Sequence, residues 1–175
     1  MRGHGTGYVP SPTRDIRDWV HYLNENEPQA FRRTFVDIGC GEGVVLTRWA
    51  KLTRALGFQQ DMIGIESDPE LIGLADAYLR RAGVQNVDLW QADATRVDYR
   101  AQTAGPLLCW LFNPFDVESV QRWSDAVNGI DTEVIANNPD HVKALIDKGW
   151  LMRHMMPHEW PRNAWFQLWN GVWSD

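Results

Sequence analysis

The chain has 175 residues, of which 44% are hydrophobic and 23% are charged, and its formal net charge is −6. This length suffices for one domain with a sizeable core, so we expect a single domain over residues 1–175. A negative net charge argues against a protein that binds DNA by neutralising phosphates, and a DNA partner is not expected. No segment has the apolar length needed to span a membrane, so no membrane partner is expected either.

Short apolar runs alternate with helical patterns along the chain, which is typical of a parallel α/β sheet. The apolar runs predict five strands, at residues 34–38, 62–65, 87–90, 107–112 and 133–136. The segments between and around them predict helices at residues 11–23, 44–56, 67–83, 116–128 and 138–149. Two further strand-like runs, at residues 150–155 and 164–173, have no helix between them, so they predict an antiparallel pair.

The first helix has both a start signal and an apolar stripe. Ser11 is the expected N-cap, and Pro12 is expected at the first helical position. Apolar residues then recur at helical spacing, at Ile16, Trp19, Val20 and Leu23.

The segment DIGCGEG, residues 37–43, places three glycines between the first strand and the next helix. Glycine permits positive φ and lets a ligand approach bare backbone, while the helix N-terminus offers free N–H groups. A dinucleotide loop of the G-x-G-x-x-G type would need its third glycine where Val44 stands. A nicotinamide-dependent oxidoreductase is therefore disfavoured.

Acidic residues accompany the strand ends near this loop. Glu66 ends the second strand and is placed to accept hydrogen bonds from both hydroxyls of a ribose. Asp93 follows the third strand and could accept one from the exocyclic amine of adenine, and Asp37 could receive a ligand ammonium group or order the loop. Each acid taken singly could be a solvated surface residue. Because ligands in open α/β sheets bind over the carboxyl ends of the strands, the three together predict one site.

These segments resemble class I S-adenosylmethionine-dependent methyltransferases, and the resemblance extends over most of the chain. The matching stretches are DIGCGEG at 37–43, GIESDPELI at 64–72, QADAT at 91–95 and LFNPFD at 111–116. The resemblance implies a Rossmann-like seven-stranded sheet of order 3-2-1-4-5-7-6 with the seventh strand antiparallel. It also implies S-adenosyl-L-methionine as cofactor, bound by Asp37, Gly39, Gly41, Gly43, Glu66, Asp93 and Ala94.

The segment Asn113-Pro114-Phe115, at the end of the fourth strand, resembles the Asn-Pro-Pro-Tyr/Phe motif of N-methyltransferases with one proline missing. Asn-Pro-Phe itself stands here in some small bacterial class I methyltransferases. The resemblance implies that Asn113 and Phe115 are catalytic, the first accepting hydrogen bonds from the target nitrogen and the second stacking on the substrate. Alternatively, Asn-Pro ends the strand as a turn and Phe115 packs in the core.

We therefore expect an N-methylating enzyme whose acceptor is a small molecule or a peptide side chain. The alternatives are a non-catalytic module that binds S-adenosylmethionine and an RNA or protein methyltransferase. His158 or Glu159 could reach the substrate as a base. Residues 1–30 form a candidate lid over the cofactor, with Tyr8 as the contact, or a frayed terminus.

Two residue types remain to be interpreted. Of the ten tryptophans, five lie in the last 26 residues, and they predict either core packing or an aromatic wall around a substrate.

Cys40 and Cys109 have no metal-ligand partner at useful spacing, so we expect a reduced, cytoplasmic protein without a bound metal. No feature of the sequence specifies an oligomeric state.

Overall fold

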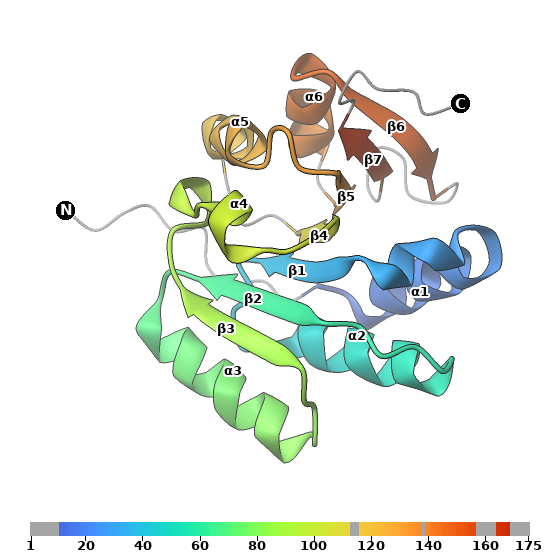
Figure 1. Cartoon of the computed structure of the whole chain (residues 1–175), viewed down its shortest axis with the longest axis vertical. Coiled ribbons are helices and arrows are strands. Elements are labelled where there is room, and N and C mark those ends of the chain that lie inside the picture. The colour runs from blue at the N-terminus through green and yellow to red at the C-terminus, as the bar shows by residue number, and fades with distance from the viewer. Residues whose placement is uncertain (1–10, 113–115, 138, 157–163, 169–175) are drawn as a thin grey trace.

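The computed structural model describes residues 11–112, 116–137, 139–156 and 164–168. Seven strands form one sheet of order β3-β2-β1-β4-β5-β7-β6 (Figure 1). Strands β1 to β5 are parallel, and β7 is antiparallel to both β5 and β6, which confirms the expected fold class. The strands are β1 Thr34–Ile38, β2 Met62–Glu66, β3 Val87–Gln91, β4 Leu107–Leu111, β5 Thr132–Ala136, β6 Trp150–Met155 and β7 Ala164–Leu168.

Helices connect the strands and cover both faces of the sheet. The predicted ones are α1 Thr13–Asn26, α2 Val44–Ala55, α3 Pro69–Arg81, α5 Val117–Ala126 and α6 Pro139–Asp147. Three short turns of helix were not predicted, because three to five residues show no periodicity. They are η1 Pro28–Arg32, η2 Ala94–Arg96 and α4 Tyr99–Gln102. No helix in the described ranges is long and apolar enough to cross a membrane.

Alternate side chains of each strand enter two different cores. In β1, Phe35 packs into the cluster beneath α1 and α2, whereas Val36 and Ile38 pack into the cluster beneath α5 and α6. In β4, Leu108 and Trp110 join the first of these clusters. The sheet is therefore the middle layer between two helical layers, as expected for a parallel sheet that is buried on both faces (Figure 1).

The tryptophans serve mainly as core residues. Trp150 and Trp165, from the C-terminal strand pair, are each 2% exposed, which confirms the core interpretation for these two. Trp160, Trp169 and Trp173 lie outside the described residues. Four more indoles, those of Trp19, Trp49, Trp110 and Trp123, are fully buried.

Side-chain caps begin α3 and α5, and the cap named from the sequence for α1 is wrong. Asp68 and Asp116 each accept a hydrogen bond from a backbone N–H in the first turn of α3 and α5. The prediction that Ser11 caps α1 is wrong, because Pro12 occupies the cap position and no side chain caps the helix. The hydroxyl of Ser11 instead accepts a hydrogen bond of 3.0 Å from the indole N–H of Trp110. A buried indole N–H needs a protein partner, whereas water can satisfy the N–H groups of an exposed helix end.

We expect Gly64→Ala to destabilise the fold. A Cβ at this position of β2 would lie 2.7 Å from Leu46 Cδ1, 2.8 Å from Leu89 Cδ2 and 3.0 Å from Cys40 Sγ. Such overpacking should lower the free energy of unfolding by about 1–3 kcal/mol in urea titrations. The control is Gly73→Ala in α3, where a Cβ would meet no atom within 4 Å. Because alanine favours helix more than glycine does, this substitution should raise the free energy of unfolding by roughly 0.5–1 kcal/mol. Equal effects of the two substitutions would contradict the packing around β2.

Candidate functional site

The C-terminal ends of β1 to β5 lie along one edge of the sheet, which we call the carboxyl edge. Ile38 lies opposite Ile65 on β2 and opposite Leu111 on β4. Leu111 in turn lies opposite Ala136 on β5. Because these strand ends are in register, the segments that follow them leave the sheet side by side. Ligands of open α/β sheets bind at this edge, so the predicted site residues should meet there.

The glycine loop crosses the end of β2. Gly39, Gly41 and Gly43 have φ angles of 73°, 52° and 76°, a region that favours glycine. The N–H groups of Gly39 and Cys40 donate to the carbonyl of Ile65, at 2.8 and 3.0 Å. Gly43 also packs on α3, since a Cβ there would lie 3.3 Å from the Cβ of Ala75. The sequence therefore needs glycine here for backbone geometry, whatever else the loop binds.

Glu66 joins the glycine loop to the start of α3. Its Oε2 accepts a hydrogen bond of 3.1 Å from the N–H of Gly41. Its Oε1 accepts two more, from the N–H groups of Ser67 at 2.8 Å and Asp68 at 3.0 Å. A carboxylate has about four acceptor positions, so Oε2 keeps capacity for a further donor.

Asp37 is the most deeply buried acid at the carboxyl edge. Its side chain is 2% exposed, and its Oδ2 has no hydrogen-bond partner within the described part of the chain. Burial, reinforced by the negative charge of Glu66, raises the pKa of Asp37 to about 8. An unpartnered carboxyl oxygen in such a place fits the binding of a cationic group of a ligand.

Asp93 and Ala94 lie where β3 ends. Asp93 Oδ1 accepts hydrogen bonds from the N–H and the hydroxyl of Thr95, at 3.0 and 2.7 Å. Burial by itself would raise the pKa of Asp93, but these two hydrogen bonds and the positive charges of Arg96 and Arg122 together lower it. Ala94 is 4% exposed, and its carbonyl accepts a hydrogen bond from the hydroxyl of Tyr99. The β3 end is tied to β2 by the N–H of Ala92, which donates to the carbonyl of Glu66 at 3.0 Å.

Several predicted residues lie outside the described residues. They are Tyr8, Asn113, Phe115, His158 and Glu159. Strand β4 ends at the carboxyl edge with Leu111, two residues before Asn113.

No metal centre is visible in the part of the chain that the structure describes. The ring of His154 stacks on Tyr22, with ring centroids 4.0 Å apart and an interplanar angle of 17°. Within the described ranges, no group of three or more His, Cys, Asp or Glu side chains could hold a metal ion.

Three polar residues at or near the carboxyl edge were missed in the sequence. Asp15, Asn137 and His141 are 7%, 8% and 1% exposed. The amide of Asn137 donates to Asp15 Oδ2 at 2.8 Å, and its backbone N–H donates to the carbonyl of Leu111 at 3.1 Å. A signal for Asp15 was present, because it stands next to Ile16 and four residues before Trp19, on the apolar stripe of α1.

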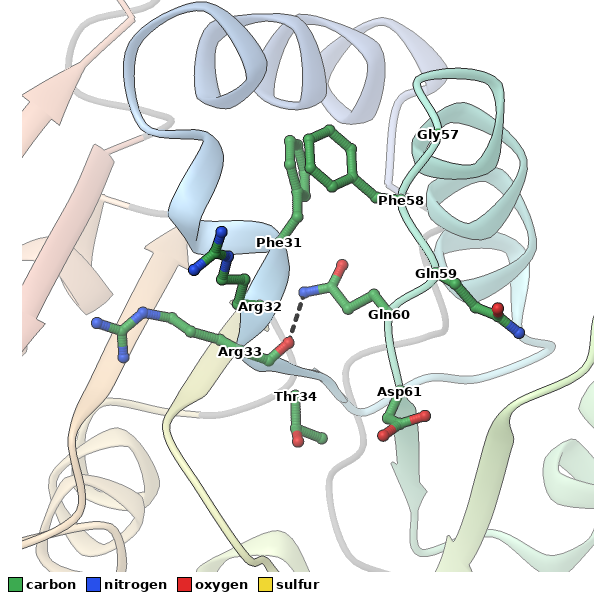
Figure 2. Close-up of a pocket in the computed structure, with 9 residues that line it drawn as sticks. All are labelled: Phe31, Arg32, Arg33, Thr34, Gly57, Phe58, Gln59, Gln60 and Asp61. Carbon is green, nitrogen blue, oxygen red and sulfur yellow. Dashed lines mark hydrogen bonds between the residues drawn. The ribbon is translucent and has the colours of Figure 1, made fainter.

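A separate pocket of about 250 Å³ lies where strands β1 and β2 begin, at the end of the sheet opposite the carboxyl edge (Figure 2). Its buried amide, Gln60, already has partners: Oε1 accepts from Trp49 Nε1 at 2.8 Å, and Nε2 donates to the carbonyl of Arg33 at 2.7 Å. We therefore assign no ligand to this pocket. Its lining residues are Phe31, Arg32, Arg33, Thr34, Gly57, Phe58, Gln59, Gln60 and Asp61.

Comparison with known proteins supports the fold. The methyltransferase domain of bacterial CtHen1-C is 15% identical to this chain with a TM-score of 0.61, and the match covers 90% of this chain and 99% of that one. An RNA methyltransferase from Salinibacter ruber, solved with S-adenosyl-L-homocysteine, is 17% identical with a TM-score of 0.61, covering 91% and 92%. An rRNA methylase from Streptococcus thermophilus is 9% identical with a TM-score of 0.56, covering 92% and 96%. No curated protein matches the sequence.

Fold and sequence together define a class I S-adenosylmethionine-dependent methyltransferase domain. Residues 35–130, more than half of the chain, match the family described as methyltransferase domain, and the chain belongs to that family. It is thus an enzyme that uses S-adenosylmethionine as methyl donor and transfers the methyl group to an acceptor.

We expect Asp37→Asn to change how folding stability depends on pH. Because the pKa of Asp37 is about 8 in the folded chain against an ordinary 3.8, the folded state holds a proton that the unfolded state has lost. The free energy of unfolding of the wild type should therefore fall as pH rises through this interval, and the variant should lack that fall. Melting temperatures of the cofactor-free proteins between about pH 5 and pH 8 measure the difference, which should reach several degrees.

The control for this measurement is Glu70→Gln, which neutralises an exposed acid of α3. It should keep the wild-type pH dependence. If the melting temperatures of the wild type and Asp37→Asn changed with pH in parallel, the raised pKa of Asp37 would be contradicted.

Proposed function

We propose that this methyltransferase transfers a methyl group to nitrogen, in a small molecule or a peptide side chain. The observation that supports a nitrogen acceptor is the Asn113-Pro114-Phe115 segment, which follows β4 and resembles the motif of N-methyltransferases. The net charge of −6 disfavours a polyanionic acceptor such as DNA. Both cysteines are free and buried, which is compatible with a reducing, cytoplasmic location.

In this proposal the carboxyl edge binds the cofactor through three regions. Gly39, Gly41 and the unpartnered carboxyl of Asp37 receive the amino-acid part, since bare backbone and a buried acid suit an ammonium group. Glu66 binds the ribose hydroxyls through the free acceptor capacity of its Oε2. Asp93 and Ala94, where β3 ends, meet the adenine ring.

S-adenosylmethionine supplies an electrophilic methyl group on a positively charged sulfur. The protein must therefore hold the acceptor nitrogen in line with that methyl group and exclude water. Asn113 accepts hydrogen bonds from the nitrogen, and Phe115 offers a π-face to the positive charge that develops on it. Of residues 1–30, only the segment before α1 is proposed as the lid, because the apolar stripe of α1 is buried in the core.

The acceptor can be identified with isotopically labelled cofactor. The protein is incubated with methyl-labelled S-adenosylmethionine and fractionated cell extract, and the products are examined by mass spectrometry. We expect the label on a nitrogen atom. A labelled oxygen or carbon atom would contradict the proposed acceptor class, and absence of any transfer would contradict the proposed reaction.

Glu66→Gln should weaken cofactor binding. The amide leaves one oxygen where the carboxylate has two, so it cannot accept from Gly41 and the ribose on one side and from Ser67 and Asp68 on the other. We expect the dissociation constant of S-adenosylmethionine, measured by tryptophan fluorescence, to rise at least about tenfold. Glu70→Gln, an exposed acid nearby in α3, serves as control and should bind like the wild type. An unchanged constant in Glu66→Gln would refute the ribose assignment.

Asn113→Ala should slow methyl transfer without a matching loss of cofactor affinity. If its side chain orients the acceptor, the turnover number with the acceptor identified by isotope labelling should fall at least about a hundredfold. Asn128→Ala, an exposed site after α5, is the control. A loss of melting temperature that accounts for the lost activity would support a structural turn instead.

A further inference from the structure

The start of α1 is bonded to the carboxyl edge at two points. Ser11 accepts a hydrogen bond from Trp110 of β4, and Asp15 accepts one from Asn137, the residue after β5. These contacts join residues 99 and 122 positions apart in the chain. The backbone N–H of Asn137 also donates to the carbonyl of Leu111. The carboxylate of Asp15 therefore lies beside the ends of β4 and β5.

In the described part of the chain, no positively charged side chain is paired with the buried Asp15. Its side chain belongs to a residue that is 7% exposed, and Asn137, its partner, is 8% exposed. Among the described residues, the amide of Asn137 is the single hydrogen-bond donor to this carboxylate, and no Lys, Arg or His forms an ion pair with it. A buried carboxylate normally has an opposite charge or several donors. Within the described ranges, one neutral amide orients this carboxyl group and no cation is paired with it.

A second buried acid lies at the same edge. Asp37 is 2% exposed, and its Oδ2 has no partner in the described ranges. Asp37 lies opposite Trp110 in the strand register, and Trp110 donates to Ser11. Two buried acids thus adjoin the same turn of chain. The proposed function assigns Asp37 to the cofactor, and Asp15 is left for the acceptor.

We propose that Asp15, oriented by Asn137, recognises a basic amine as the methyl acceptor. This inference rests on the proposed transfer to nitrogen and narrows the acceptor to an amine that is cationic when protonated. An amide or an aromatic ring nitrogen would not neutralise the buried carboxylate. The assignment also explains why an acid occupies the apolar stripe of α1, next to Ile16.

The charge changes of the reaction favour such a carboxylate. The acceptor binds as an ammonium ion and gives one proton to water before attack, and the lone pair of the free base then forms the new N–C bond. The C–S bond breaks, its electron pair stays on sulfur, and the products are a neutral thioether and a methylated ammonium ion. Positive charge therefore moves from sulfur to nitrogen, where Asp15 stabilises it. The product leaves as a methylated ammonium ion, so the proton released overall is the one that the acceptor lost before attack.

A binding experiment tests this inference without an identified acceptor. S-adenosyl-L-homocysteine is titrated first, and the saturated protein is then titrated with primary amines of increasing size. Each amine is compared with the alcohol of the same carbon skeleton, and binding is followed by calorimetry. The wild type should prefer at least one ammonium ion over its alcohol by about tenfold or more.

Asp15→Asn is the informative variant because its side-chain oxygen can still accept the hydrogen bond from Asn137. Glu25→Gln removes the same charge from an exposed position of the same helix and is the matched control. We expect Asp15→Asn to lose the preference for amines, to bind S-adenosyl-L-homocysteine with unchanged affinity, and to melt no lower than the wild type. Glu25→Gln should behave as the wild type.

Three results would overturn the inference. They are a wild type that prefers no amine, an Asp15→Asn variant that keeps the preference, and a variant that loses affinity for S-adenosyl-L-homocysteine by the same factor. The last would place Asp15 at the cofactor. Failure of the proposed function appears elsewhere, in the labelled-cofactor experiment, as transfer to oxygen or carbon or as no transfer.

Discussion

Strand β1 is hydrogen-bonded on both sides, so that Ile38 lies opposite Ile65 of β2 and Leu111 of β4. This register aligns the strand ends, and with them the glycine loop and Glu66. A shift of one residue would turn every side chain of β1 to the other face, placing Asp37 among the helices on the wrong side. The hydrophobic residues of β1, such as Phe35 and Val36, prevent this because each fills a different core. Packing of apolar side chains therefore sets the position of the polar ones.

The carboxyl edge holds polar groups that are buried at a cost to stability. Asp15, Asp37, Asn137 and His141 are all below 9% exposed. Groups held in this way need no rearrangement when charge develops near them, and this preorganisation is what a methyl transfer requires from the protein. The opposite end of the sheet carries a pocket as well, but the hydrogen bonds of its buried Gln60 are used within the fold. The proposed chemistry therefore lies at the carboxyl edge.

Much of the fold could be predicted because its signals are local. The strands and the longer helices follow from apolar periodicity, and Asp68 and Asp116 act as caps through residues two or three positions away. The cap predicted at Ser11 is wrong for a non-local reason. Its hydroxyl accepts a hydrogen bond from the indole N–H of Trp110, which is 99 residues away in the chain. The site was predicted in the same way: Glu66 and the glycines stand in recognisable short motifs. Asp15 and Asn137 belong to no motif.

The sequence by itself determined the α/β class and the glycine loop, because glycine requirements and strand periodicity act over a few residues. Its resemblance to methyltransferases indicated the cofactor. Only the tertiary structure decided which distant polar residues meet. It brought Asp15 and Asn137 to within 2.8 Å across 122 residues of chain, and it left Asp37 buried with an unpartnered oxygen. The physical reason is that burial and hydrogen-bond partners are properties of the packed layers, which no local pattern records.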